Sequence, residues 1–405
     1  MNKQKALNIC ERLRAISFYF LAAGVAFSNA ITEMSIVAII STWIICMILK
    51  KEPSLPAKGL SAILFVLIFW NLLSFINTEY MSESLRGVLK VIKLSLLFMA
   101  TAEYFSTKGR LKKFILFVLG FGFLISLNGI IQYITGVDII RGKTINPLDH
   151  LHRVSSSFRH ANDFGAYLIV IATIFCSLFF SMAHTFRKRI LITIAASPVI
   201  WCLWSTDSRG AWLGFIFGFL FLAMIKSKKL FVSIILFILI FSVFIPSSVK
   251  DRFSDFSTIN ASGGTVYERI QLWKGTFEMV KIHPVIGFGV NTYTKNFPKY
   301  KPKDYPDVRY THNSYLHMAA EVGVVGAGIF TLFLLSVIIT GVAPIRSFSK
   351  GVDRDLALGM LAGVVGFLAH CAVDTHIYSV TLSAFLFLCL GTIVGFRQIG
   401  YEKNS

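Results

Sequence analysis

The sequence is poor in charged residues, which make up only 15% of its 405 residues, against roughly 25% in soluble proteins. Hydrophobic residues make up 55% of the chain, and 38 of them are phenylalanine. These residues fall in runs of about 17 to 23, which is long enough to cross a hydrocarbon core of roughly 30 Å as a helix. The composition excludes a soluble globule and predicts a polytopic membrane protein.

Acidic residues are the scarcest charged class, with 21 Asp and Glu against 40 Lys and Arg, so that the net charge is +19. In a soluble chain this excess would suggest a nucleic-acid partner. In a multi-span protein it is expected from basic residues retained in cytoplasmic loops, and we predict no nucleic-acid partner. Five of the six cysteines lie in apolar runs and Cys10 precedes the first run, so no disulfide is expected. The chain also lacks a Gly-rich phosphate loop, a nucleophile elbow and a Cys-rich zinc pattern.

We therefore expect an all-α polytopic membrane protein, with one transmembrane domain over residues 1–405 and about twelve spans. The first span is expected to remain uncleaved. Lys and Arg are concentrated in alternate loops, which predicts that both termini are cytoplasmic. The expected spans are 15–30, 34–49, 59–76, 86–105, 112–134, 161–183, 188–204, 209–225, 229–245, 315–341, 356–374 and 378–396.

Two segments that this topology places outside are too long to be simple connections. They are residues 135–160 and residues 246–314, and loops of this length are expected to be functional. In the longer one, apolar residues recur at helical spacing and predict an amphipathic helix at about 265–282. The helix is expected to end at His283-Pro284.

Three arginines contradict the usual distribution of positive charge, because Arg153, Arg159 and Arg209 lie outside or at the outer ends of spans. An arginine near membrane depth needs a partner, and its planar fork of donors matches phosphate oxygens. A phosphate-bearing ligand on the outer face is therefore one explanation. The alternative is that each arginine reaches lipid headgroups.

Polar residues also open three of the expected spans at their outer ends. A helix N-terminus has free N–H groups and a partial positive charge, so three such ends brought together would form an anion-binding site. The three segments are 159–163, 207–210 and 311–314.

Two lysines lie within an expected span, where they rarely face lipid. Lys90 and Lys93 share one helical face with Arg86. They either line a cleft that receives acidic headgroups or pair internally, and Glu321 and Asp374 are the acids considered for that pairing.

His312 is the best candidate for a general base, because it stands at the outer start of a span beside Asn313. His160 is the second candidate, and a purely structural histidine is the alternative for both. A further group could suggest a metal, but its spacing matches no common site, so no metal is expected. That group is His370, Asp374 and His376.

Over about residues 120–390 the sequence resembles the membrane O-antigen ligases, with the related O-antigen polymerases, of Gram-negative lipopolysaccharide assembly. Each motif that carries the resemblance is weak alone, but the set in this order is specific. The motifs are Arg159-His160-Ala161-Asn162, Ser208-Arg209-Gly210-Ala211-Trp212, Glu268-Arg269 with Trp273, His283-Pro284 with Gly287-Phe288-Gly289, and Thr311-His312-Asn313-Ser314-Tyr315.

The resemblance implies a GT-C-like helical glycosyltransferase of the bacterial inner membrane, with a large periplasmic loop and a periplasmic active site. It implies transfer of a glycan from undecaprenyl pyrophosphate to a sugar hydroxyl of the lipid A core, in contact with membrane lipids and without cofactor or metal. The functional arginines of the family match Arg209 and Arg269, and outer-loop arginines match Arg153 and Arg159. Its functional histidine matches His312.

These roles fit elementary chemistry, because arginines stabilise a leaving pyrophosphate and a histidine takes the proton of the acceptor hydroxyl. His312 could instead hydrogen-bond the departing phosphate. The helix at 265–282 would bring Arg269 over the site as part of a lid, with His160, Asn313, Lys90 and Lys93 as supporting residues. An O-antigen polymerase differs only in its acceptor. A flippase or transporter of lipid-linked glycans, the alternative of another class, should have binding groups near mid-membrane.

Overall fold

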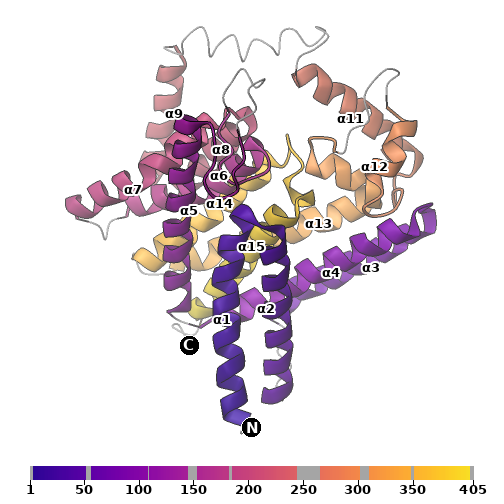
Figure 1. Cartoon of the computed structure of the whole chain (residues 1–405), viewed down its shortest axis with the longest axis horizontal. Helices are drawn as coiled ribbons and strands as arrows, with labels where there is room; N and C mark the ends of the chain where they lie inside the picture. Colours follow the sequence, from indigo (N-terminus) through magenta and orange to yellow (C-terminus); the bar gives the residue numbers. More distant parts are fainter. Residues whose placement is uncertain are drawn as a thin grey trace.

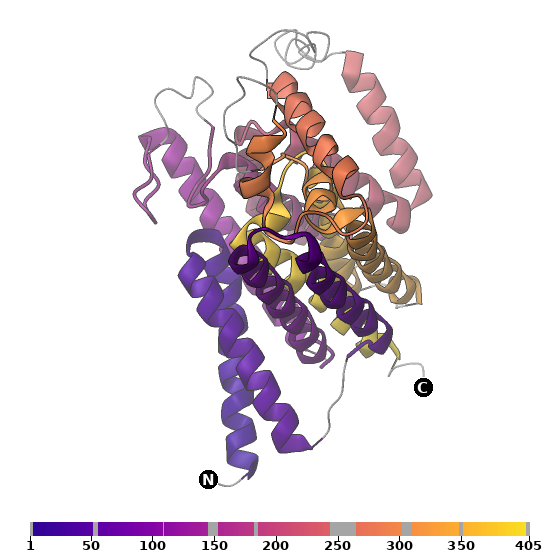
Figure 2. The same cartoon turned by 90° about the vertical axis from the view of Figure 1, so that its right-hand side faces the viewer.

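The computed structural model describes residues 3–51, 56–107, 109–144, 153–181, 185–243, 265–301, 310–347 and 351–401. Within these ranges every regular element is a helix, and the only strand-like pairing is an isolated bridge between Val137 and Thr144. The beginning of the first helix and the end of the last lie at the same end of the molecule in both views (Figure 1 and Figure 2). The expectation of a helical membrane protein is confirmed.

Each expected span corresponds mainly to one helix. These helices are α1 (Lys3–Phe27), α2 (Asn29–Lys50), α3 (Lys58–Leu73), α4 (Met81–Tyr104), α5 (Arg110–Thr135), α6 (Ala161–Phe179), α7 (Phe186–Ser205), α8 (Arg209–Lys226), α9 (Lys228–Val243), α13 (Ser314–Ser347), α14 (Val352–His370) and α15 (Val380–Tyr401). Among the described residues, seven helices are long and apolar enough to cross a membrane: α2, α3 with the short η1 (Ser74–Asn77), α5, α6, α8, α13 and α15. A total of about twelve spans stays a prediction.

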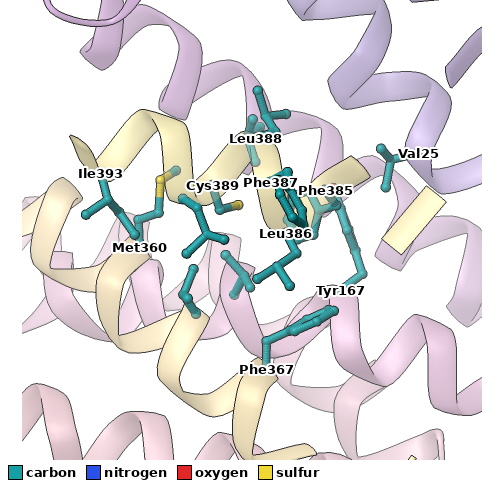
Figure 3. Packing of buried hydrophobic residues seen from close by; sticks show 14 of the residues in the cluster. Val25, Tyr167, Met360, Phe367, Phe385, Leu386, Phe387, Leu388, Cys389 and Ile393 are labelled. Atoms are coloured by element: carbon teal, nitrogen blue, oxygen red, sulfur yellow. The ribbon is translucent and has the colours of Figure 1, made fainter. Parts of the chain in front are cut away.

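The hydrophobic core is centred on α6, α14 and α15. Figure 3 shows Tyr167 of α6, Met360 and Phe367 of α14 and Phe385 of α15 in one cluster of buried side chains. Small residues allow close approach here, since a Cβ on Gly214 of α8 would lie 2.7 Å from a backbone oxygen of α14. This packing holds the starts of α6 and α8 next to the end of α14.

Only parts of the two long segments are described. Residues 145–152, 246–264 and 302–309 lie outside the described ranges. The helix expected at about 265–282 corresponds to α11 (Thr265–Ile282), which is followed by α12 (Tyr293–Asn296) and η2 (Phe297–Lys299). Figure 1 shows α11 and α12 beside α13. A separate hydrophobic cluster joins α11 to this segment and to α13.

One expected span differs in shape from the prediction. The range 315–341 reads as continuous, yet α13 is interrupted at Gly323, whose φ of 73° and ψ of 170° are not helical. The apolar residues around Gly323 gave no signal of this break, because the partners that stabilise it come from a distant part of the chain.

Candidate functional site

His312 lies at the start of α13, against the turn that joins α14 to α15. Its Nδ1 is 3.1 Å from Oδ1 of Asp374 in that turn. The backbone of His312 is in the left-handed region at φ 52°, which is costly for a residue with a Cβ. Neighbouring Ser314 holds the segment in place, because its N–H donates to the Cys371 carbonyl at 2.8 Å and its hydroxyl donates to the Asp374 carbonyl at 2.8 Å.

Asp374 is the centre of the hydrogen-bond network, with a side chain that is only 9% exposed. Its Oδ1 also accepts the N–H of Thr375 at 2.8 Å, and its Oδ2 accepts Nδ2 of Asn162 at 2.6 Å. Because these partners are donors, they favour the ionised carboxylate. A carboxylate on Nδ1 of His312 places the proton on that nitrogen and leaves Nε2 with a lone pair.

Arg153 joins the same network through Asn162. Its Nη2 donates to Oδ1 of Asn162 at 2.6 Å, and its Nε donates to the Thr206 carbonyl at 2.9 Å, in the turn before α8. Arg153, Asn162, Asp374 and His312 therefore form a continuous chain of contacts. This chain connects the starts of α6 and α13 with the turns before α8 and after α14.

Arg269 and Arg209 approach this network from α11 and α8. Burial lowers the pKa of Arg269, Asp374 opposes that shift, and the positive charges of Arg209 and Arg153 add to it. These electrostatic effects place the Arg269 guanidinium in the neighbourhood of all three groups. The structure thus brings together side chains from residues 153, 209, 269 and 312, which are widely separated in the sequence.

Arg159 and His160 lie at the rim of this site, with exposed side chains. Burial lowers the pKa of His160, an effect that Asp163 opposes and Arg159 reinforces. The shift favours the neutral imidazole, which is the form that a base needs.

Contacts of Asp374 and Arg153 link the three polar helix starts, but two of the starts already have caps. The hydroxyl of Ser208 accepts the N–H of Ala211 in α8, and Oδ1 of Asn313 accepts two N–H groups in α13. In α6 the N-cap residue His160 provides no side-chain hydrogen bond. Asn313 therefore acts as a helix cap, and the guanidinium groups are better placed than the helix ends to bind an anion.

A second carboxylate–histidine pair lies behind the first. Nδ1 of His376 is 3.2 Å from Oδ1 of Asp163, and Nε2 of His376 is 3.2 Å from Nδ1 of His370. Ligand-type atoms of His370, His376 and Asp374 all lie within 4.8 Å of one another, so the group could hold a metal ion. The sequence spacing had argued against such a site. Hydrogen bonds give both nitrogens of His376 a partner without a metal, and the absence of a metal stays a prediction.

Lys90 and Lys93 make internal contacts. Their direct partners differ from the acids considered from the sequence, although the charge of one of those acids, Glu321, acts on Lys90. Nζ of Lys93 is 2.6 Å from Oε2 of Glu33 in α2. Nζ of Lys90 donates to the Tyr378 carbonyl at 3.0 Å. Glu33 was missed because it lies between the first two expected spans, whereas α2 begins before it, at Asn29.

Sequence reasoning missed the roles of Asp374 and Asn162 at this site. Asp374 was noted only as a possible partner of lysines, and Asn162 only as part of a motif. A usable signal existed, since Asp374 is an acid at the outer end of an expected span, where a charge needs a partner.

Comparison with known proteins gives one family match over part of the chain. Residues 194–331 match a family model described as O-Antigen ligase, and that range contains Arg209, Arg269 and His312. No curated protein matches the chain.

Among solved structures, the chain is similar to one from a study titled "Structural coordination of polymerization and crosslinking by a peptidoglycan synthase complex". The two share 12% identity with a TM-score of 0.47, over 86% of this chain and 98% of that chain. The family match over residues 194–331 supports membership of the O-antigen ligase family, which the motifs of the sequence resemble.

Proposed function

We propose that this protein is an O-antigen ligase, which transfers a glycan from undecaprenyl pyrophosphate to a sugar hydroxyl of the lipid A core at the periplasmic face of the inner membrane. The observation that carries the proposal is the contact between His312 and Asp374, with Arg153, Arg209 and Arg269 around it. The family match supports the class of reaction. An architecture of about twelve spans with both termini cytoplasmic is part of the proposal.

In the reaction, the acceptor hydroxyl loses its proton to Nε2 of His312 as its oxygen attacks the first carbon of the glycan. The bond from that carbon to the pyrophosphate breaks, and undecaprenyl pyrophosphate leaves with both electrons of the bond. In-line attack inverts the configuration at the carbon. Asp374 stabilises the imidazolium that forms, as the carboxylate of a catalytic triad does.

The arginines act on the leaving group. Guanidinium groups bind phosphate oxygens two at a time, and in a site shielded from water they stabilise the growing negative charge strongly. Arg209 and Arg269 hold the pyrophosphate, while Arg153 and Arg159 extend the positive surface. No metal is needed, because the pyrophosphate is already a good leaving group.

His312 could instead donate a hydrogen bond to the departing phosphate. The contact of Nδ1 with Asp374 favours the role of base, because it leaves Nε2 able to accept a proton. The polymerase alternative uses the same groups and differs in the acceptor, a second lipid-linked glycan.

The test is a reconstituted assay with labelled undecaprenyl-pyrophosphate glycan and either lipid A core or a second lipid-linked glycan as acceptor. We expect transfer to lipid A core, and loss of at least about a hundredfold in His312→Ala, Arg209→Ala and Arg269→Ala. His160→Ala, as a comparison for the choice of base, should retain more activity than His312→Ala. Transfer only to the second glycan would identify a polymerase. Wild-type rates in all three variants would refute the mechanism.

A further inference from the structure

The interruption of α13 is stabilised by a distant segment of the chain, residues 283–291, which we call the strap. A break in a membrane helix leaves backbone groups without their helical partners, and these must be satisfied within the protein. Strap residues supply three such contacts. They are the Val324 N–H to the Pro284 carbonyl at 2.8 Å, the Phe288 N–H to the Ala320 carbonyl at 3.1 Å and the Gly289 N–H to the Glu321 carbonyl at 2.9 Å.

Three glycines make this contact possible. Gly287, Gly289 and Gly323 have φ values of 68°, 110° and 73°, which residues with a Cβ rarely adopt. A Cβ on Gly287 would collide with the Glu321 carbonyl, and one on Gly323 with the Val285 carbonyl. The strap and the broken helix therefore fit only backbone against backbone, which explains the Gly-Phe-Gly motif.

The strap is also attached to the corner between α3 and α4. Nδ2 of Asn77 donates to the Gly287 carbonyl at 3.0 Å, and the N–H of Val290 donates to the hydroxyl of Ser74 at 3.1 Å. Two distant parts of the chain thus hold one short segment, and a segment fixed at so many points does not move independently.

The strap directly follows α11, the helix that carries Arg269, and α11 is attached at a second point. Nε1 of Trp273 donates to the carbonyl of Thr311 at 3.0 Å, immediately before His312. Leu272, next to Trp273, and Met279, between the two attachments, are buried in the cluster that includes Ala320 of α13. Arg269 lies one helical turn from Trp273, so the attachments fix its distance from His312.

We infer that α11 is a fixed wall of the site, and that Gly287, Gly289 and Gly323 are positioning residues that act through Arg269. The inference rests on the proposed function, since Arg269 matters because it binds the pyrophosphate. It also revises the expectation of a lid, because substrates must reach His312 without movement of α11. A displacement of about 1 Å at a reacting group can cost roughly a hundredfold in rate, which gives a reason for such a rigid attachment.

A reversible cross-link tests whether the strap, and with it the end of α11, must separate from α13. Val285 and Val324 are 53% and 50% exposed and flank the contact between the strap and α13. In a Cys10→Ser/Cys176→Ser background, Val285→Cys/Val324→Cys protein is joined with a short reducible bis-thiosulfonate linker. We expect transfer within about twofold of the reduced protein, whereas a lid that must open would lose at least about tenfold and recover on reduction. The second result would overturn the inference.

Glycine variants test whether the strap positions Arg269. Gly323→Ala should lower transfer about a hundredfold, while Gly328→Ala, in the same helix with nothing near its Cβ, should stay within about twofold. In an Arg269→Lys background that retains measurable transfer, Gly323→Ala should have a smaller effect than alone, because coupled sites are not additive. The inference would be overturned if Gly323→Ala lowered transfer equally in both backgrounds, or if Gly323→Ala alone kept the wild-type rate.

A distance measurement separates this inference from the proposed function. Spin labels at Glu278→Cys of α11 and Leu332→Cys of α13, both on exposed positions, report the separation of the helices. We expect one narrow distribution that undecaprenyl pyrophosphate leaves unchanged. A shift of more than about 5 Å on addition of this lipid would refute the fixed wall. Failure of the proposed function appears separately, as absence of transfer by the wild-type protein.

Discussion

Asp374→Asn is the most informative single substitution, because it removes one charge while keeping the size of the side chain. The carboxylate accepts hydrogen bonds from Asn162 on one oxygen, and on the other from Thr375 and His312. An amide must turn its NH₂ toward one of these donors, so at least one contact is lost. If the NH₂ faces His312, the imidazole adopts the other tautomer and its Nε2 can no longer accept a proton.

The expected magnitude follows from the two roles of the carboxylate. Loss of an oriented base costs about 10²- to 10⁴-fold in rate. An unsatisfied buried donor costs about 1–3 kcal/mol of stability, which the many remaining helix contacts can tolerate. We therefore expect Asp374→Asn to insert and accumulate, and to lose at least about a hundredfold in kcat with little change in donor KM.

The assay is transfer from labelled undecaprenyl-pyrophosphate glycan to lipid A core by purified protein in liposomes. Asp163→Asn is the matched control, because Asp163 contacts His376 rather than His312 and its side chain is also partly buried. Asp163→Asn should lose clearly less transfer activity than Asp374→Asn. A rate for Asp374→Asn within about threefold of wild type would refute the role of His312 as a base oriented by Asp374.

Two further predictions follow from the same end of the molecule. Gly210→Ala should reduce transfer at least about tenfold, because its Cβ would lie 2.7 Å from Cδ2 of the buried His370 and displace Arg209. Gly120→Ala is the control, because an added Cβ there would have no atom within 4 Å. An unchanged transfer rate in Gly210→Ala would show that the start of α8 tolerates a shift of its backbone. Protein washed with a chelator should keep full activity and contain no stoichiometric metal by elemental analysis. The opposite result would be loss of transfer after chelation, recovery of transfer on addition of a divalent ion, and no such recovery in His376→Ala. That result would assign a metal to the His370, Asp374 and His376 group.

Helices were predictable because their signal is local. Hydropathy alone placed a span at 112–134, where α5 runs from Arg110 to Thr135, and helical spacing placed one at 265–282, where α11 lies. Arg153, Arg159, Arg209 and His312 were recognisable from their positions at the outer ends of expected spans, whereas Arg269 was recognised only through the resemblance of its motif to a known family. The hydropathy and charge of a single stretch of sequence were enough to place these helices and to recognise these four residues.

Contacts between distant segments were not predictable in the same way. Asp374 is 62 positions from His312, and Lys93 is 60 positions from Glu33. Nothing in either local sequence selects the partner, since that choice depends on how α2, α4, α13 and α14 pack. The break at Gly323 is similar, because a glycine in an apolar run is tolerated in a continuous helix unless another segment replaces the lost hydrogen bonds.

The two ends of α8 show why chemistry is expected at one end only. At its last residue, Lys226 forms a 2.6 Å ion pair with Asp355, and both side chains are almost inaccessible, at 12% and 8% exposure. At its first residue, Arg209 lies near a network whose histidine is 43% exposed and can meet a substrate. Between them α8 is packed against α14 at glycine positions that leave no space for a polar substrate. Along α8, the accessible polar groups therefore lie at the end that carries Arg209, a distribution that agrees with group transfer at one membrane face.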